Sequence, residues 1–151
     1  MKNQKSKSAF TMIELVFIIV IIGILAAVAI PRLAATRDDA QITKAKVLVA
    51  SVRNALAMER QKRILRGEFK PLTAVGDTTN VFGDFYDEDG NTEVAVLEYP
   101  IVSEPGKKDR WSFAGDEYIF KSVLGDVAFK VDNGKFVCVD ETTDACKTLT
   151  K

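Results

Sequence analysis

The first third of the chain is dominated by one apolar segment. Leu15–Ile30 holds twelve Leu, Ile, Val or Phe residues and no charge. Counted from Phe10, the segment spans about 31 Å as an α-helix at 1.5 Å per residue, which matches a hydrocarbon core of about 30 Å. Its side chains favour membrane insertion by about 4–7 kcal/mol, and Glu14 near its start reduces that gain. We therefore predict a membrane-spanning helix over residues 10–31.

Beyond Pro31 the apolar residues become periodic. They follow i, i+3, i+4, i+7 spacing on one helix face, at Ala45, Leu48, Val49, Val52, Ala55 and Leu56. Gly67 is a typical residue just after a helix end, and the basic turns before it suit the negative end of the helix dipole. The pattern predicts one helix over 10–66 whose second half, residues 32–66, is amphipathic.

From Val94 onward, alternating and β-branched residues predict strands. We expect them at Val94–Tyr99, Arg110–Ala114, Tyr118–Val123, Asp126–Val131 and Lys135–Val139. Asn133-Gly134 between the last two is a strong hairpin signal. Aromatic side chains are expected to cover the amphipathic half of the helix: Trp111, Phe113, Phe120, Phe129 and Phe136. The predicted fold is α+β, with a long membrane-embedded and then amphipathic helix packed against a small antiparallel head of three or four strands.

Two segments of the 67–151 region carry weaker signals. Glu68–Glu93 is rich in Gly, Asp, Thr and Asn and is predicted to be a connector loop. Within it, Asp87–Glu93 places oxygens at alternate positions, as calcium ligands require. A plain acidic turn is favoured over a calcium site because the spacing does not fit an EF-hand loop. Glu141–Lys151 is expected to be a short polar tail.

The amino-acid composition excludes several classes of binding and catalytic function. The 21 basic and 21 acidic residues balance, so no basic field for nucleic acid is indicated. The basic cluster Arg60–Arg66 is expected to be a solvated helix end rather than a site for phosphate or an acidic partner. Histidine is absent, which excludes Ser-His-Asp and Cys-His catalysis and His-containing zinc sites. We expect neither an enzyme nor a cofactor or metal site.

The residues before the span carry three lysines and no acid: Lys2, Lys5 and Lys7. This charge favours a cytoplasmic N-terminus. The small-residue junction Ser8-Ala9 precedes the apolar run, unlike the cleavage site of an ordinary secretory signal. Glu14, inside the span, needs a partner. Either the N-terminal amine of a neighbouring copy supplies one, or Glu14 lies at headgroup depth without a role.

At these residues the chain resembles the type IV pilin-like family, which includes type IV pilins and type II secretion pseudopilins. The family's short basic leader ends in a pattern like Gly-Phe-Thr-Leu-Ile-Glu, and this chain has Ala9-Phe10-Thr11-Met12-Ile13-Glu14. The resemblance implies that a prepilin peptidase removes residues 1–9, that Phe10 is N-methylated, and that Glu14 pairs with the amine of an adjacent subunit. Ala9 is a departure, because Gly is usual there.

The resemblance also bears on two further features, the expected helix kinks and the two cysteines. Gly23 and Pro31 are the positions where we expect the helix to kink, because Gly is a poor helix former and Pro removes a backbone donor; Pro31 also falls where many family members kink. Cys138 and Cys146 are either free thiols or a disulfide, which would close a nine-residue loop worth about 2.5 kcal/mol. The resemblance favours the disulfide, because many type IV pilins close a C-terminal loop this way.

The function implied by the resemblance is that of a structural filament subunit. The chain would wait in the bacterial inner membrane with its N-terminus in the cytoplasm. It would then enter a periplasmic or cell-surface homo-oligomeric filament, together with related minor subunits. A membrane platform and an assembly ATPase are the implied partners. The residues do not separate a pseudopilin from a pilin. The alternative is a membrane-anchored periplasmic binding module that never polymerises, in which Glu14→Val would leave function intact.

Overall fold

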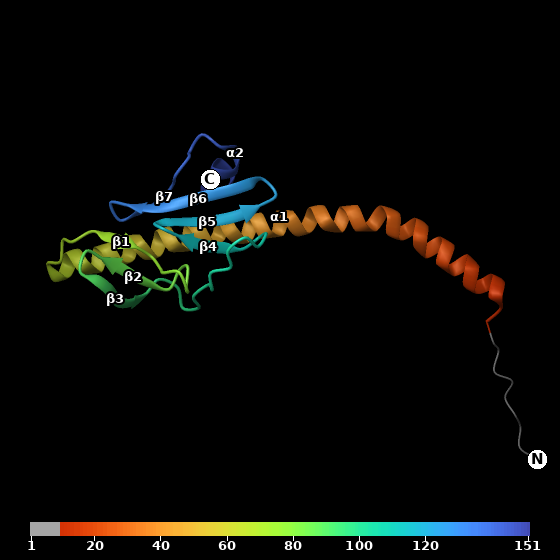
Figure 1. The fold of residues 1–151 in the computed structure, drawn as a ribbon, viewed down its shortest axis with the longest axis horizontal. Helices are drawn as coiled ribbons and strands as arrows, with labels where there is room; N and C mark the ends of the chain where they lie inside the picture. Colours follow the sequence, from red (N-terminus) through yellow and green to blue (C-terminus); the bar gives the residue numbers. More distant parts are fainter. Residues whose placement is uncertain (1–9) are drawn as a thin grey trace, which may run out of the picture. The chain divides into compact units, whose positions relative to one another are not determined.

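The computed structural model describes residues 10–151 and divides into two compact units, one ending at Arg37 and one running from Asp38 to Lys151. Helix α1, Met12–Arg66, contributes to both (Figure 1). The predicted single helix is therefore confirmed, and α1 continues without interruption through Pro31.

A Schellman motif ends α1. Gly67 adopts a positive φ of 82°, which suits a residue without a Cβ. The Glu68 N–H donates to the Arg63 carbonyl at 2.9 Å, and the Gly67 N–H donates to the Ile64 carbonyl at 3.0 Å. These two bonds satisfy carbonyls that the helix end would leave free.

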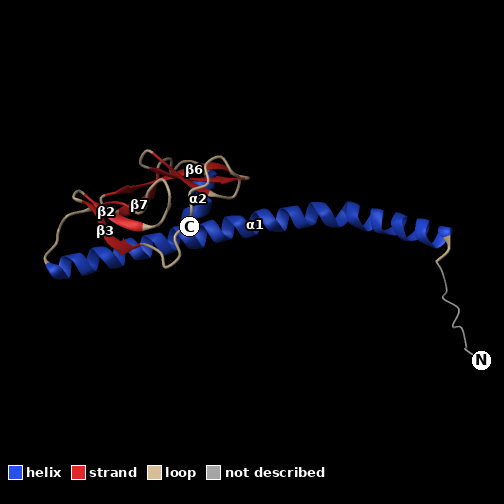
Figure 2. Cartoon of the chain, turned by 60° about the horizontal axis from the view of Figure 1, so that its bottom comes forward, coloured by secondary structure: helices blue, strands red, loops and turns tan. Residues whose placement is uncertain are grey.

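The second half of α1 buries the predicted face. Ala45, Val49, Val52 and Leu56 are buried, and Leu48 and Ala55 are partly buried against the same core. Both β-sheets of the Asp38–Lys151 unit lie along this half of the helix (Figure 2).

A three-stranded antiparallel sheet occupies part of the expected connector. Its strands are β1 Leu72–Ala74, β2 Asp84–Asp87 and β3 Gly90–Ala95, in the order β1-β2-β3. The prediction of a loop over 68–93 and a strand over 94–99 was therefore wrong. The physical reason is tertiary: Phe85 on β2 is buried in the core, and this burial selects a strand in a segment whose composition favours turns.

A second sheet contains four strands in a meander. They are β4 Trp111–Ala114, β5 Glu117–Ser122, β6 Gly125–Asp132 and β7 Lys135–Cys138, in the order β4-β5-β6-β7. The bounds of these strands agree with those of four predicted strands to within two residues at each end, so the four predictions are confirmed. Asn133 and Gly134 have φ values of 49° and 70°, as a type I′ hairpin turn requires. The head thus contains two sheets rather than the expected one of three or four strands.

Aromatic side chains form the centre of the core. Four of the five predicted members, Trp111, Phe120, Phe129 and Phe136, are buried, whereas Phe113 is only partly buried. The central ring is one that the sequence pattern assigned to the connector. Phe82 lies 5.1 Å from Trp111, 5.6 Å from Tyr118 and 5.8 Å from Phe136, measured between ring centroids.

The C-terminal segment is a helix, not the expected polar tail. Helix α2, Asp144–Thr150, begins after Thr143, whose hydroxyl oxygen accepts a hydrogen bond from the Cys146 N–H at 3.3 Å. Ala145, Cys146 and Leu149 are buried. A disulfide joins Cys146 to Cys138 on β7 across a Cα–Cα distance of 6.3 Å. The prediction of a polar tail was wrong because Ala145, Cys146 and Leu149 are spaced for one helix face and are buried in the core.

Candidate assembly site

The start of α1 is closed by a reciprocal capping box. The Thr11 N–H and hydroxyl donate to Glu14 Oε2 at 2.8 and 2.7 Å, and the Glu14 N–H donates to Thr11 Oγ1 at 3.3 Å. The Leu15 N–H donates to the Thr11 carbonyl at 3.2 Å, which places Thr11 at the N-cap. Glu14 therefore caps the helix, because its carboxylate satisfies donors that a helix N-terminus leaves free.

Thr11 is the N-cap residue of α1, which the sequence interpretation missed. The signal was present, since Thr-x-x-Glu before an apolar run is a capping-box pattern. Phe10 precedes the helix and is 80% exposed, and Glu14 is also exposed. A second group can therefore reach the Glu14 carboxylate. Ala9 lies outside the described residues. Cleavage before Phe10, its methylation and the amine partner of Glu14 stay predictions.

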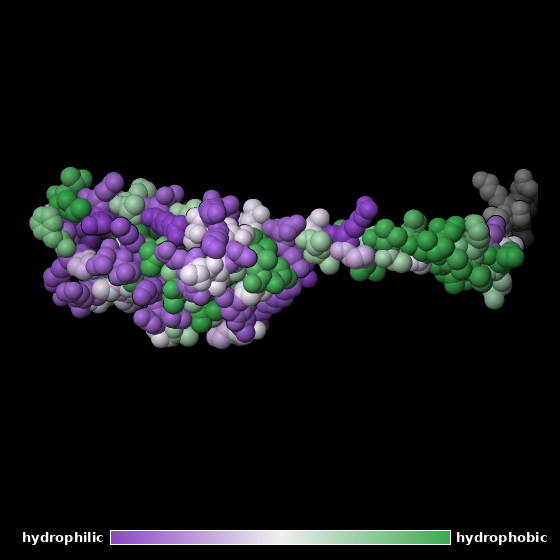
Figure 3. All heavy atoms as spheres, turned by 90° about the horizontal axis from the view of Figure 1, so that it is seen from above, coloured by the Kyte–Doolittle hydropathy of each residue, from purple (hydrophilic) through white to green (hydrophobic). Residues whose placement is uncertain are grey.

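Among the described residues, none covers the large apolar side chains of the run Leu15–Ile30. Every Leu, Ile, Val and Phe from Leu15 to Ile30 is exposed, and the face drawn in Figure 3 is largely hydrophobic along the N-terminal part of α1. By length and composition α1 can cross a membrane. A Cβ added at Gly23 would meet nothing within 4 Å, so packing within the chain does not require glycine there. The kinks at Gly23 and Pro31 stay predictions.

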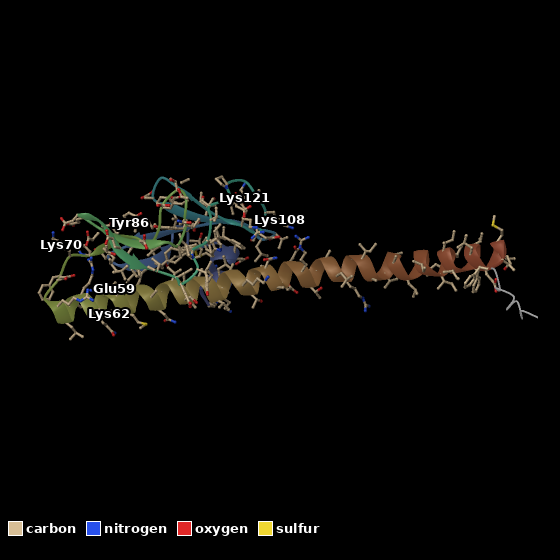
Figure 4. All side chains as sticks on the ribbon, turned by 90° about the horizontal axis from the view of Figure 1, so that it is seen from below. Glu59, Lys62, Lys70, Tyr86, Lys108 and Lys121 are labelled. Atoms are coloured by element: carbon tan, nitrogen blue, oxygen red, sulfur yellow. A yellow bond between two sulfur atoms is a disulfide. The ribbon has the colours of Figure 1, made fainter. Side chains whose placement is uncertain are left out.

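The distal end of α1 carries a buried ion cluster. Glu59 and Arg63 are both buried, and Arg63 Nη2 lies 2.5 Å from Asp87 Oδ2 on β2. Arg63 Nε lies 3.8 Å from Glu59 Oε1, and Lys62 Nζ lies 3.9 Å from Glu59 Oε2 (Figure 4). The Arg63 hydrogen bond, and next the Asp89 N–H, lower the pKa of Asp87. The expectation of a solvated Arg60–Arg66 cluster is therefore wrong for Arg63.

The acidic segment Asp87–Glu93 forms the β2–β3 hairpin. Asp87 pairs with Arg63, and Asp89 pairs with Lys70. Asp87 Oδ1 also accepts the Asp89 N–H at 2.9 Å. Two of the carboxylates considered as calcium ligands are thus engaged with cations of the chain. Within residues 10–151, no group of three His, Cys, Asp or Glu side chains is arranged to hold a metal ion.

Comparisons with known proteins match the N-terminal segment to a described motif. Residues 4–30 match the prokaryotic N-terminal methylation motif. This match covers most of the segment on which the sequence resemblance rests. No solved structure matches the chain.

The similar proteins include components of type II secretion systems and of a type IV pilus. The chain is 38% identical over 56 residues to type II secretion system core protein G of Pseudomonas aeruginosa, covering 37% of this chain and 39% of the relative. It is 34% identical over 58 residues to core protein G of Vibrio cholerae, covering 38% and 40%. It is 47% identical over 49 residues to the type IV narrow pilus major component PilA5 of Thermus thermophilus, covering 32% and 42%. The alignments thus span about two fifths of the relatives' lengths.

Proposed function

We propose that this protein is a structural subunit of a type IV pilus-like filament, assembled from the inner membrane through α1 after residues 1–9 are removed. The observation that carries the proposal is the methylation-motif match over residues 4–30, which ends within the exposed and uncharged part of α1. The similarity to a pilus component and to secretion core proteins supports it.

The exposed run supplies the driving force for assembly. In the bilayer, lipid covers Leu15–Ile30; in a filament, the same run of neighbouring copies replaces the lipid. One subunit joins another by a repeated head-to-tail contact, which generates an open helical fibre. Cleavage before Phe10 creates an amine that can pair with the Glu14 carboxylate of the next subunit and so compensate its charge.

The partners and location follow from this proposal. A prepilin peptidase cuts between Ala9 and Phe10 and methylates Phe10, and a membrane platform with an assembly ATPase extracts the subunits. The lysines before the span keep the N-terminus cytoplasmic, and the head lies in the periplasm or on the cell surface. The fibre is either a secretion pseudopilus, which the two core protein G relatives favour, or a pilus, which PilA5 and the Cys138–Cys146 disulfide favour.

An intact mass of the native protein tests the proposal. Membranes or sheared filaments are taken from cells with an active prepilin peptidase. We expect a chain that starts at Phe10, carries one added methyl group and lacks two hydrogens because of the disulfide. A mass that starts at Met1 would overturn the filament proposal and leave a membrane-anchored binding module.

Glu14→Gln tests the amine pairing separately from helix capping. Glutamine is also found at this position of capping boxes, so the variant retains the hydrogen bonds with Thr11 but loses the charge. We expect normal membrane insertion and loss of sheared filaments. The matched control is Thr11→Ala, which removes the cap and retains the carboxylate; its filaments should persist. Wild-type filament yield from Glu14→Gln would show that Glu14 acts only as a cap.

A further inference from the structure

An apolar groove with a volume of about 570 Å³ runs between α1 and the strand β7. Leu56, Ala57 and Ile64 line it on the helix, and residues 134–137 line it on β7 and the turn before it. Alternate residues of a strand face opposite sides of a sheet. Lining by consecutive residues therefore means that the groove follows the edge of β7 rather than one face of the sheet. We call this hollow the α1–β7 groove.

The backbone of Phe136 faces the α1–β7 groove. In an antiparallel pair, the N–H and C=O of one residue point to the partner strand, and those of the next residue point away from it. The Phe136 carbonyl points away from β6, because it accepts a hydrogen bond from Arg53 Nε on α1 at 3.0 Å. The Phe136 N–H therefore points away from β6 as well, and an extended chain in the groove could accept a hydrogen bond from it.

The opposite edge of the same sheet, along β4, is covered by the chain itself. The Glu104 N–H donates to the Trp111 carbonyl at 3.0 Å, and the Ser103 hydroxyl oxygen accepts the Phe113 N–H at 3.2 Å. A strand edge with outward-facing backbone groups is a template for a further strand. In this sheet β7 is therefore the edge at which another strand can be added.

The charges around the α1–β7 groove restrict its occupant. Arg53, Arg60 and Lys135 contribute to the lining, and Arg60 and Lys135 are exposed. Among the described residues that line the groove, none is acidic. The positive charge is complementary to carboxylates, and the apolar lining is complementary to aliphatic side chains. An extended peptide with acidic residues on either side of aliphatic ones matches the edge, the charge and the lining together.

We propose that the α1–β7 groove binds an extended acidic segment of another protein, which adds a strand to β7. This inference goes beyond the proposed filament role, because it concerns the head of a single membrane-embedded copy. The backbone hydrogen bond with Phe136 contributes to binding whatever the sequence of the segment. Ion pairs with Arg60 and Lys135 select acidic segments over neutral ones.

Binding of a synthetic peptide to the full chain tests the proposal. The protein is reconstituted at one copy per nanodisc in phosphatidylcholine, and the probe is fluorescein-labelled Glu-Val-Leu-Val-Glu with an amidated C-terminus. We expect saturable binding by fluorescence anisotropy. The matched peptide Gln-Val-Leu-Val-Gln has a similar shape and lacks the carboxylates, so it should bind at least about tenfold more weakly. Absence of saturable binding, or equal binding of the two peptides, would overturn the inference.

Amide hydrogen exchange locates the bound peptide. Because the added strand accepts the Phe136 N–H, exchange over residues 134–138 should slow when the acidic peptide binds. Exchange over 111–114, at the covered edge of the sheet, should stay unchanged. Binding without slower exchange over 134–138 would place the peptide elsewhere and overturn the inference.

A charge reversal in the groove provides a second measurement. Arg60→Glu replaces an attraction to the peptide's carboxylates with a repulsion, so we expect at least about a tenfold loss of affinity. The matched control is Arg66→Glu, because Arg66 is exposed on the same helix and does not line the groove. It should retain wild-type affinity. Formation of the Cys138–Cys146 disulfide in both variants shows that the head has folded. Wild-type affinity of Arg60→Glu would contradict the proposed contact.

Other occupants of the groove would give different results. Slower exchange over residues 134–138 in phosphatidylglycerol nanodiscs without peptide would assign the groove to an anionic lipid. The same change in phosphatidylcholine nanodiscs that hold several copies would assign it to a second copy of the chain. Either result would overturn the assignment to a peptide of another protein.

The inference and the proposed function fail separately. A protein that forms normal filaments and binds no acidic peptide would overturn the inference and leave the filament role intact. A protein that retains residues 1–9 in cells with an active prepilin peptidase, yet binds the peptide at β7, would overturn the filament role and support the inference.

Discussion

At the scale of single residues, Tyr118 connects the two sheets. Its side chain is 1% exposed, and its hydroxyl oxygen accepts a hydrogen bond from the Val75 N–H, just after β1, at 2.9 Å. Its ring packs against Phe82 and Phe136. Burial raises the pKa of Tyr118 to about 12. One side chain therefore combines core packing with the hydrogen bond that a buried backbone donor needs.

Tyr118→Phe should destabilise the protein by about 1–3 kcal/mol, because it leaves the buried Val75 N–H without an acceptor. The measurement is thermal or denaturant unfolding of the detergent-solubilised full chain at pH 7. Tyr99→Phe is the control, since that side chain is exposed, and it should change nothing. An unchanged stability of Tyr118→Phe would show that a water replaces the hydroxyl.

The raised pKa of Tyr118 also predicts a loss of stability in alkali. The folded state favours the neutral phenol, so its stabilisation is complete below the unfolded pKa of about 10 and is lost as the pH rises through about 12. The wild-type protein should therefore lose about 2–3 kcal/mol between these values, at 1.36 kcal/mol per pKa unit. Tyr118→Phe should lose less over the same window. Parallel curves for the two proteins would contradict this assignment.

At the scale of elements, the Arg63–Asp87 pair holds the end of α1 to the β2–β3 hairpin. Asp87→Asn removes a charge and leaves Arg63 buried with Glu59 and Glu68 as its close acidic neighbours, at 3.8 and 3.9 Å. We expect a loss of about 1.5–3 kcal/mol at pH 7, because a hydrogen bond between charged groups is lost. Because the pKa of Asp87 is lowered, the wild-type stabilisation is present above the unfolded pKa of about 3.9 and is lost as the pH falls below it.

The unfolding free energy of Asp87→Asn should consequently vary less than that of the wild type below pH 4. Asp89→Asn, on the same hairpin, is the matched control, because its ion pair with Lys70 is exposed and such pairs contribute little. An Asp87→Asn variant as stable as the wild type would show that the pair is not a stabilising contact.

The disulfide is the second connection between elements, joining β7 to α2. Replacing Cys138 and Cys146 with Ser should cost about 2.5 kcal/mol on the chain-entropy model for a nine-residue loop. It should also raise amide hydrogen exchange in α2, a short helix that cannot persist without tertiary contacts. Exchange in β5 and β6 should change little. Unaltered protection of α2 would show that the burial of Leu149 suffices to hold it.

At the scale of the whole molecule, the division between Arg37 and Asp38 separates an exposed apolar helix from a unit with its own core. A chain that begins at Asp38 should therefore fold as a soluble monomer with the disulfide formed, because its core residues all lie beyond that position. Size-exclusion chromatography and circular dichroism measure this outcome. Aggregation of the shortened chain would show that its folding needs the upstream half of α1.

The sequence alone determined the parts of this protein that depend on local order. Hydropathy and helical period predicted α1 and its core face, and the Asn133-Gly134 turn predicted the last hairpin, because these signals come from neighbours along the chain. The residues around Phe10 and Glu14 likewise indicated the family, because a short contiguous motif needs no distant partner to be recognised.

Only the tertiary structure decided the parts that depend on distant partners. The strand at Phe85, the central place of Phe82 and the helix after Thr143 arise where buried apolar contacts outweigh weak local preferences. The burial of Arg63 depends on Asp87, 24 positions away. A cation becomes buried only when the folded chain brings it a counter-charge, and its own segment of sequence does not record that partner.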